Sequence, residues 1–311
     1  MQGRAFLGPA SGPEREYVFG ARDRMDERYD IIRAVRDKRY RYIRNYEPWK
    51  PYYQYMATPE RGATMKELRR LHAEGKLNAA AELFMAERKP LEELYDLQAD
   101  PHEIHNLIDS PEHAKTADRL REALERWQRE ILDLGFLPET EIVVREKEAG
   151  SRYAIFRREG GQALWERIRE AAILAGRPEQ SDRKALERLL DDSDAAVRYW
   201  GAIGLGNLGA AAAPARAALA SALRDAASCV RIAAARALAA MGEAGEALPV
   251  LEAELSGAEE WARLAAAIAL DEMGPAARPA QAAFERALED SNKYVVRVAV
   301  HALEALQGDN A

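Results

Sequence analysis

The sequence predicts an α+β N-terminal part, a small antiparallel sheet with helices, followed by an all-α helical solenoid. Three observations predict this fold. The chain has 311 residues, which is more than one compact domain usually contains. Short runs with the alternation of strands lie in its first hundred residues. Glycine and arginine then recur about every 33 residues in its second half, which is typical of a repeat protein.

Hydrophobic alternation predicts four strands in the N-terminal part. They are residues 16–21, 30–36, 40–46 and 92–97. Asp37 and Lys38 join the second strand to the third, and two residues are enough for a hairpin turn. We expect all four strands to form one antiparallel sheet.

Two helices should accompany this sheet. Residues 64–87 and 110–134 both have the pattern of helices. Ser110 is suited to cap the second helix, Pro111 fits its first turn, and Gly135 follows its end. We expect this helix to pack on one face of the sheet and to leave the other face without cover.

Two motifs in this part carry a family resemblance. They are YDIIRAVRDKRYRYIRNY (29–46) and ELYDLQADPHEIHNL (93–107), and an amphipathic helix follows the second. Together they resemble the C-terminal subdomain of the sulfatases, which belong to the alkaline-phosphatase-like superfamily. The resemblance covers about residues 14–135. It implies a sheet beside a large catalytic α/β domain, and a full-length enzyme that uses calcium and formylglycine.

The nucleophile that this resemblance implies has no convincing counterpart in the sequence. Sulfatases make formylglycine from Cys or Ser in a C/S-x-P/A-x-R motif, and the modified residue supplies an oxygen nucleophile. Cys229 stands in CVRIA, which departs from the motif. Ser11 begins SGPER, which matches it, but no aspartates precede Ser11 and a strand follows at once. We predict no catalytic residue, metal ligand or cofactor in this chain. We expect a fragment or remnant that is inactive without a catalytic domain.

The second motif also holds two of the five histidines, His102 and His105. One interpretation is a metal site, because an i, i+3 pair can face one way on a helix, although zinc normally takes three or four ligands. The preferred interpretation is a turn that begins at Asp100 and Pro101, with Asn106 bonded to nearby backbone.

Contact with substrate is predicted for one charged segment. Nine basic and five acidic residues lie between Arg22 and Arg44. In the sulfatases the loop after the first strand of this subdomain reaches the rim of the sulfate pocket, and residues 21–30 occupy that place. The rim candidates are Arg22, Asp23, Arg24 and Asp26. The arginines could meet a sulfated sugar and the aspartates could accept hydrogen bonds from its hydroxyl groups. The alternative is a solvated cluster whose charges pair with one another.

The second half of the chain resembles HEAT repeats over about residues 163–311. Its segments DDSDAAVR, DAASCVR and DSNKYVVR are similar to the turn and the start of the second helix of these repeats. The recurring residues are Gly176, Gly209, Gly242, Gly274 and Gly308, with Arg198, Arg231, Arg263 and Arg297. Each glycine suits the end of a helix. The apolar helical positions should form one continuous core.

Two further expectations concern these repeats. Asp192, Asp225 and Asp290 should pair with the arginines as a ladder between neighbouring repeats, because partly buried charges need partners. The third repeat has Ser256 and Gly257 in place of the aspartate, so the ladder should be interrupted there. Trp200 stands where the other repeats have alanine, and we expect it to fill the junction with the preceding part.

The predicted division is a sulfatase-like subdomain (1–138), a linker (139–162) and HEAT-like repeats (163–311). Residues 181–311 carry 13 basic and 19 acidic side chains, so we expect no nucleic-acid binding. No window approaches the roughly 18 apolar residues of a membrane span. The first residues lack the pattern of a secretory signal, and the compartment is left open.

Two functions follow from these observations. The first is the C-terminal part of a sulfatase with an accessory HEAT array, which would meet a sulfated substrate only together with the catalytic domain. The second is a non-catalytic interaction protein that binds a protein partner through the HEAT array.

Overall fold

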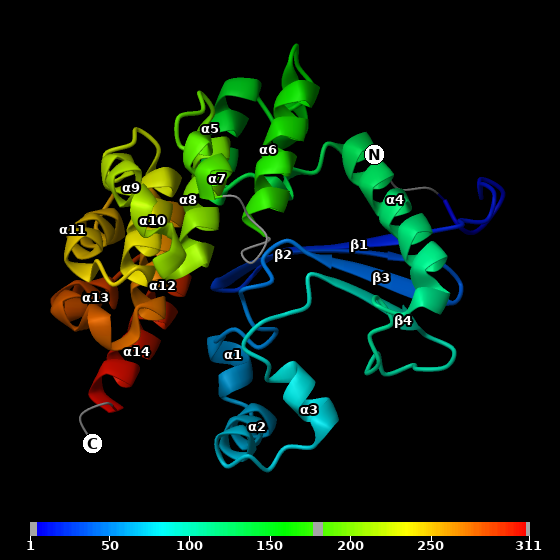
Figure 1. The fold of residues 1–311 in the computed structure, drawn as a ribbon, viewed down its shortest axis with the longest axis horizontal. Helices are drawn as coiled ribbons and strands as arrows, with labels where there is room; N and C mark the ends of the chain where they lie inside the picture. The colour runs from blue at the N-terminus through cyan, green and yellow to red at the C-terminus, as the bar shows by residue number, and fades with distance from the viewer. Residues whose placement is uncertain (1–4, 177–182, 309–311) are drawn as a thin grey trace.

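The computed structural model describes residues 5–176 and 183–308 of the protein. A four-stranded antiparallel sheet leads into a curved array of helices that lies along one side of it (Figure 1). The predicted fold class, an α+β part followed by an all-α solenoid, is therefore confirmed. The described residues include no helix that is long and apolar enough to cross a membrane.

The sheet has its strands in the order of the sequence. They are β1 (Val18–Met25), β2 (Arg28–Arg36), β3 (Tyr40–Asn45) and β4 (Glu92–Asp96). Helix α4 (Ala114–Ile131) covers one face and packs Leu120 and Leu124 against Val35, Tyr42 and Leu94. Three short helices lie between β3 and β4 in the sequence and below the sheet in Figure 1: α1 (Ala57–Glu60), α2 (Ala63–Ala73) and α3 (Ala79–Phe84).

The connections between the first three strands differ from the prediction. Residues 21–30 are not a loop, because β1 and β2 pair up to Met25 and Arg28 and leave a two-residue turn. Asp26 occupies the left-handed region of that turn (φ 48°), which aspartate tolerates. The β2–β3 turn has two residues, as predicted, but they are Lys38 and Arg39, because the Asp37 N–H donates to the carbonyl oxygen of Tyr40 at 3.0 Å. The Asp37 carboxylate holds it by accepting the N–H groups of Arg39 (2.8 Å) and Tyr40 (2.6 Å).

The two predicted helices also have different limits. Residues 64–87 form two helices, since Gly75 (φ 64°) ends α2 and the Asn78 side chain caps α3. The second helix ends at Leu132, whose φ is 52°, and Gly135 does not serve as its end. Gly135 instead lies in a short 3-10 turn, where its missing side chain leaves room for the guanidinium of Arg33.

The solenoid stacks pairs of helices. Its elements are α6 (Gly161–Ala175), α7 (Arg183–Leu189), α8 (Ala195–Leu208), α9 (Arg216–Ala222), α10 (Ser228–Ala240), α11 (Ala244–Leu255), α12 (Glu260–Glu272), α13 (Gln281–Ala287) and α14 (Lys293–Gly308). Gly209, Gly242 and Gly274 have positive φ after α8, α10 and α12, as predicted for helix ends. The expected linker contains helix α5 (Glu139–Ala149), which packs against α10 and α12. The boundaries at 138 and 163 stay a prediction.

The predicted ladder is present, and the predicted interruption is wrong. Arg198 pairs with Asp225 at 2.7 Å and Arg263 with Asp290 at 2.7 Å. Arg231 pairs with Glu254 at 2.5 Å. Gly257 takes the place of the aspartate, because its carbonyl oxygen accepts from Arg263 as those of Asp192 and Asp225 accept from Arg198 and Arg231. Glu254 lies three residues before Gly257, about one helical turn, and its carboxylate reaches the guanidinium of Arg231.

Trp200 lies at the junction, as predicted. Its side chain is 1% exposed, and its indole N–H donates to the carbonyl oxygen of Phe136 at 2.8 Å. The buried residues of the solenoid form two clusters that meet at α10, and Leu223 packs against both. One cluster joins Trp200 and the first repeats to Ile31 and Tyr46 of the N-terminal part, and a second cluster fills the later repeats. The first repeat has therefore merged its core with the sulfatase-like part.

Candidate functional site

The four rim candidates do not form one site. Arg22, Asp23 and Arg24 belong to β1, where successive side chains point to opposite faces, and Asp26 lies in the turn. Asp23 contacts Arg33 at 2.8 Å, and the Asp26 carboxylate lies 3.8 Å from the guanidinium of Arg297. These charges are partnered inside the molecule.

Arg22 is the exception among the four. Its strand partner is Ile32, on the face of the sheet away from α4. Its Nε and one Nη are buried, and no described residue accepts a hydrogen bond from them. A guanidinium without an acceptor is costly to bury. Arg22 thus keeps two buried nitrogen atoms without an acceptor within the described chain. The expectation that this face lacks cover is wrong over β3 and β4, where Ile43, Asn45, Glu93 and Tyr95 are buried.

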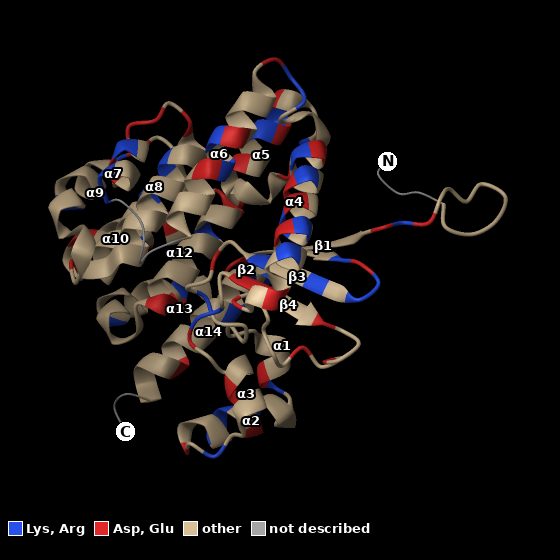
Figure 2. Cartoon of the chain, turned by 45° about the vertical axis from the view of Figure 1, so that its right-hand side comes forward, with Lys and Arg blue, Asp and Glu red and all other residues tan. Residues whose placement is uncertain are grey.

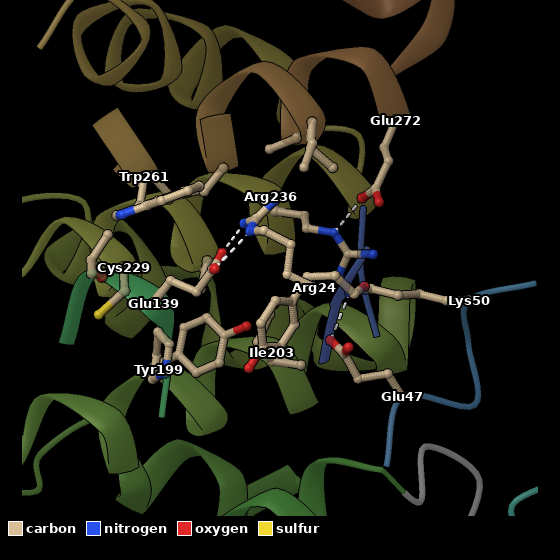
Figure 3. A pocket seen from close by; sticks show the side chains of 18 of the residues that line it. Arg24, Glu47, Lys50, Glu139, Tyr199, Ile203, Cys229, Arg236, Trp261 and Glu272 are labelled. Atoms are coloured by element: carbon tan, nitrogen blue, oxygen red, sulfur yellow. Dashed lines mark hydrogen bonds and ion pairs between the residues drawn. The ribbon is translucent and has the colours of Figure 1, made fainter. Parts of the chain in front are cut away.

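The register of β1 shifts between Arg22 and Arg24, which interrupts the alternation of faces. Arg24 points into a cavity between the N-terminal part and the solenoid (Figure 3). The cavity has a volume of about 130 Å³. Its walls come from the β1–β2 hairpin, the loop after β3, the start of α5, and helices α8, α10 and α12. Trp261 and Tyr199 supply aromatic surface on the solenoid side.

The cations of this cavity are each paired with a carboxylate. The Arg24 Nε donates to Glu139 at 2.7 Å, the Arg236 Nε donates to Glu272 at 2.6 Å, and Lys50 contacts Glu47 at 2.8 Å. The lining is therefore electrically neutral.

Arg24 also lies over the Trp261 ring, 4.7 Å from its centroid. Burial lowers the pKa of Arg24 to about 10, so its guanidinium stays charged at neutral pH. With its charges already paired, the cavity suits a small neutral ligand better than a sulfate group.

Cys229 lines this cavity and carries a thiol, which could act as a nucleophile in its thiolate form. Its side chain is buried, and burial raises the pKa of the thiol to about 12. The thiol lies against the Thr140 hydroxyl, which has no other described hydrogen-bond partner. Because the thiolate is the reactive form, Cys229 is a poor nucleophile at neutral pH.

The turn interpretation of ELYDLQADPHEIHNL is confirmed. The Asp100 carboxylate accepts the N–H groups of Ile104 (2.8 Å) and His105 (2.7 Å). The Asn106 side chain accepts the N–H of Leu94 at 2.9 Å. His102 and His105 are exposed. Across residues 5–176 and 183–308, no three His, Cys, Asp or Glu side chains are grouped closely enough to hold a metal ion.

Ser11 lies in an exposed N-terminal arm that projects from the body (Figure 2). Its backbone N–H donates to Gly8 at 3.0 Å. This setting differs from the helix start that a sulfatase motif requires.

Sequence reasoning did not identify the solenoid residues of the cavity. Arg236 interrupts the apolar run RIAAARALAA, and Glu272 follows IALD. A charged residue within such a run is a signal that could have identified Arg236, because charges in an apolar helix face need a partner.

Comparisons with known proteins agree with both resemblances. Residues 183–271 match the family model of HEAT repeats. The chain is 48% identical over 143 residues to an ulvan-active sulfatase of Formosa agariphila. The aligned segment covers 46% of this chain and 24% of that protein. A second ulvan-active sulfatase of the same organism is 32% identical over 144 residues, 42% of this chain and 24% of the relative. The chain spans about a quarter of the length of these curated relatives. It thus contains a sulfatase-like region and a region of HEAT repeats.

Proposed function

We propose that this chain is the C-terminal part of a sulfatase, an enzyme that hydrolyses sulfuric esters, and that the HEAT array is its accessory. The observation that carries this proposal is the 48% identity to an ulvan-active sulfatase over 143 residues. The names of both relatives favour a sulfated polysaccharide of the ulvan type as the substrate.

In this proposal the sheet face away from α4 meets the catalytic domain or its substrate. Arg22 brings unpartnered N–H groups to that face, and Val18 is 55% exposed there. The N–H groups of Arg22 would donate to a sulfate oxygen or to a carboxylate of the catalytic domain.

Calcium and formylglycine would be held outside the described residues. The residues present do not fit either group, since Ser11 lies on an exposed arm and no carboxylate cluster of metal-binding size is grouped within the described chain. No step of the reaction is therefore assigned to this chain's side chains.

The interaction-scaffold function is less well supported. Helices α8, α10 and α12 form the inner side of the array, which the β1–β2 hairpin and the start of α5 cover. A protein partner of the array would therefore contact its outer helices α7, α9, α11 and α13.

A complementation assay tests the sulfatase proposal. The Formosa agariphila relative is produced without the segment that matches this chain, and sulfate release from ulvan is measured before and after the chain is added. We expect each protein alone to be inactive and the mixture to recover activity. In the Arg22→Gln variant recovery should fall, whereas Arg126→Gln, an exposed arginine of α4 on the opposite side of the sheet, should behave like the unmodified chain.

Two results would contradict the proposal. The first is a mixture of two folded proteins that neither associate nor release sulfate. The second is aryl sulfate hydrolysis by the chain alone that disappears in Ser11→Ala, because the nucleophile would then lie in the exposed arm.

A further inference from the structure

A second cavity lies on the other side of the N-terminal part, among β3, β4, α4 and α6. Its volume is about 330 Å³. The lining residues combine three arginines with two carboxylates, two tyrosines, a glutamine and two apolar side chains: Arg44, Arg121, Arg169, Glu92, Glu125, Tyr42, Tyr46, Gln128, Leu124 and Ile173. Tyr42, Arg44 and Tyr46 belong to the first sulfatase-like motif, and the other seven lining residues lie outside both motifs.

Glu92 is fully engaged at one end of the cavity. Its carboxylate accepts from the Tyr42 hydroxyl at 2.6 Å and from the Arg121 Nε at 2.9 Å and Nη at 3.0 Å. Arg44 lies 3.1 Å from the same carboxylate. Burial alone would raise the pKa of Glu92, but these donors hold it at about 2, so the group is ionised at neutral pH. One carboxylate thus serves two arginines.

Arg44 and Arg169 are each 7% exposed, so their charges are buried at the cavity wall. Among the described residues, Arg44 contacts one carboxylate, that of Glu92. Arg169 reaches Glu125 at 3.1 Å, and the side chain of Glu125 is 42% exposed. The Nε of Arg169 is buried and has no hydrogen-bond partner within the described chain.

The carboxylates are unevenly placed around the three arginines. Two carboxylates line the cavity, and Asp118 at its outer edge pairs with Arg121 at 2.6 Å. Arg121 therefore has two acidic partners, whereas Arg44 shares Glu92 with it. Glu166 pairs with Arg129 at 2.5 Å and lies 3.9 Å from Arg169, beyond hydrogen-bond distance. Basic and acidic side chains are interspersed along α4 (Figure 2), so the hydrogen-bonding capacity that is left over belongs to Arg44 and Arg169.

The size of the cavity fits a group larger than water. About ten water molecules at ~30 Å³ each would fill it, and its volume is at the low end of the roughly 300–1,000 Å³ of small-molecule pockets. Leu124 and Ile173 offer apolar surface beside the guanidinium groups. Planar guanidinium groups match the oxygens of sulfate and phosphate in paired hydrogen bonds.

We propose that this cavity binds a tetrahedral oxyanion through Arg44 and Arg169. The ligand is a sulfate group, either free sulfate or the sulfate ester of a sugar. The oxyanion follows from the cavity, and the choice of sulfate rests on the proposed function. Binding is measured on this chain alone, so its failure is distinguishable from a failure of the complementation assay.

Calorimetric titration of the full chain tests this proposal. Free sulfate and ulvan oligosaccharides, with their desulfated form as the matched negative, are titrated at low millimolar concentration and fixed ionic strength. Low concentration is necessary because sulfate stabilises most folded proteins by exclusion when it is concentrated. We expect saturable binding of free sulfate, of the sulfated oligosaccharide, or of both, with no binding of the desulfated form. The titrant that binds more tightly shows whether the ligand is free sulfate or the sulfate ester of a sugar.

Three variants locate the site. Arg169→Gln should weaken binding roughly tenfold or more, as expected for the loss of charge-assisted hydrogen bonds. Arg126→Gln removes an exposed arginine of α4 and should leave binding unchanged. Glu125→Gln releases Arg169 from its half-exposed partner and should tighten binding several-fold, a gain that a folding defect would not produce.

The proposal is overturned if the unmodified chain binds neither sulfate form above a chloride control. It is also overturned if Arg126→Gln weakens binding as much as Arg169→Gln, or if Glu125→Gln weakens it.

Discussion

Truncation of Trp200 to alanine tests how the solenoid is fixed to the sulfatase-like part. The indole is 1% exposed and lies in the cluster that joins Ile31, Tyr46 and Phe136 to the first repeats. Removing a buried tryptophan side chain costs about 3–5 kcal/mol in the free energy of unfolding. The carbonyl oxygen of Phe136 also loses its indole donor, which adds about 1–3 kcal/mol if no water replaces it.

Urea unfolding of the full chain measures the total loss in the free energy of unfolding. Hydrogen exchange shows which helices lose stability. We expect faster exchange in α8 and in residues 133–137, with α12–α14 unchanged, because the buried residues of these later helices lie in the second cluster. Phe284→Ala is the matched control. Its ring is 0% exposed in the second cluster, so a similar loss should appear as faster exchange in α12–α14 instead.

Two results would refute this reasoning. One is a loss below about 1 kcal/mol for Trp200→Ala, because truncation of a tryptophan at a well-packed junction destabilises a protein by more than that. The other is an equal loss in an isolated solenoid of residues 183–308, which would place Trp200 in the core of the repeats alone.

Three further outcomes are expected. Arg28→Met should lower the free energy of unfolding by about 1–3 kcal/mol, because the buried Asp271 carboxylate loses its 2.8 Å partner and keeps the 2.7 Å contact with His301; urea unfolding against Arg36→Met measures this. Glu92 has its pKa lowered from 4.5 to about 2, so the stability it provides is fully present above about pH 4.5 and is lost as the pH falls through 2. Thermal unfolding between pH 5 and 2 should therefore show a shallower pH dependence in Glu92→Gln, and an unchanged slope would contradict the shift. The buried Cys229 thiol, with a pKa of about 12, should resist alkylation at pH 8 until urea unfolds the chain, and fast labelling of the native protein would disprove its burial.

The strands and repeats could be predicted because their signals are local. Alternation in residues 30–36 and 40–46 and the recurring glycines depend on neighbours in the sequence. The charged run at 21–30 was misinterpreted as a loop because its partners are distant. Arg24 bonds to Glu139, 115 positions away, and Arg33 bonds to Asp133, 100 positions away.

The candidate sites show the same limit. Arg236 meets the N-terminal part, and Arg169 meets α4, only after the solenoid has folded back along the sheet. The Glu254 contact was missed for a simpler reason. Glu254 lies about one helical turn before Gly257, and a pattern of identical residues at fixed spacing does not identify a partner at another position.

The ladder of arginines does not stop at the last repeat. Arg297 of α14, the fourth arginine of the series, contacts Glu27 in the β1–β2 turn at 3.1 Å, and Arg28 beside it holds Asp271 of α12. The array is therefore anchored at both ends, by Trp200 near its start and by this turn near its finish. In most solenoids each repeat contacts only its neighbours, so no contact links one end of the array to the other. Here the N-terminal part contacts α8 and α14 together and so holds the curvature of the helices between them. A repeat inserted or removed between Trp200 and Arg297 would move Arg297 away from the turn and break this second attachment.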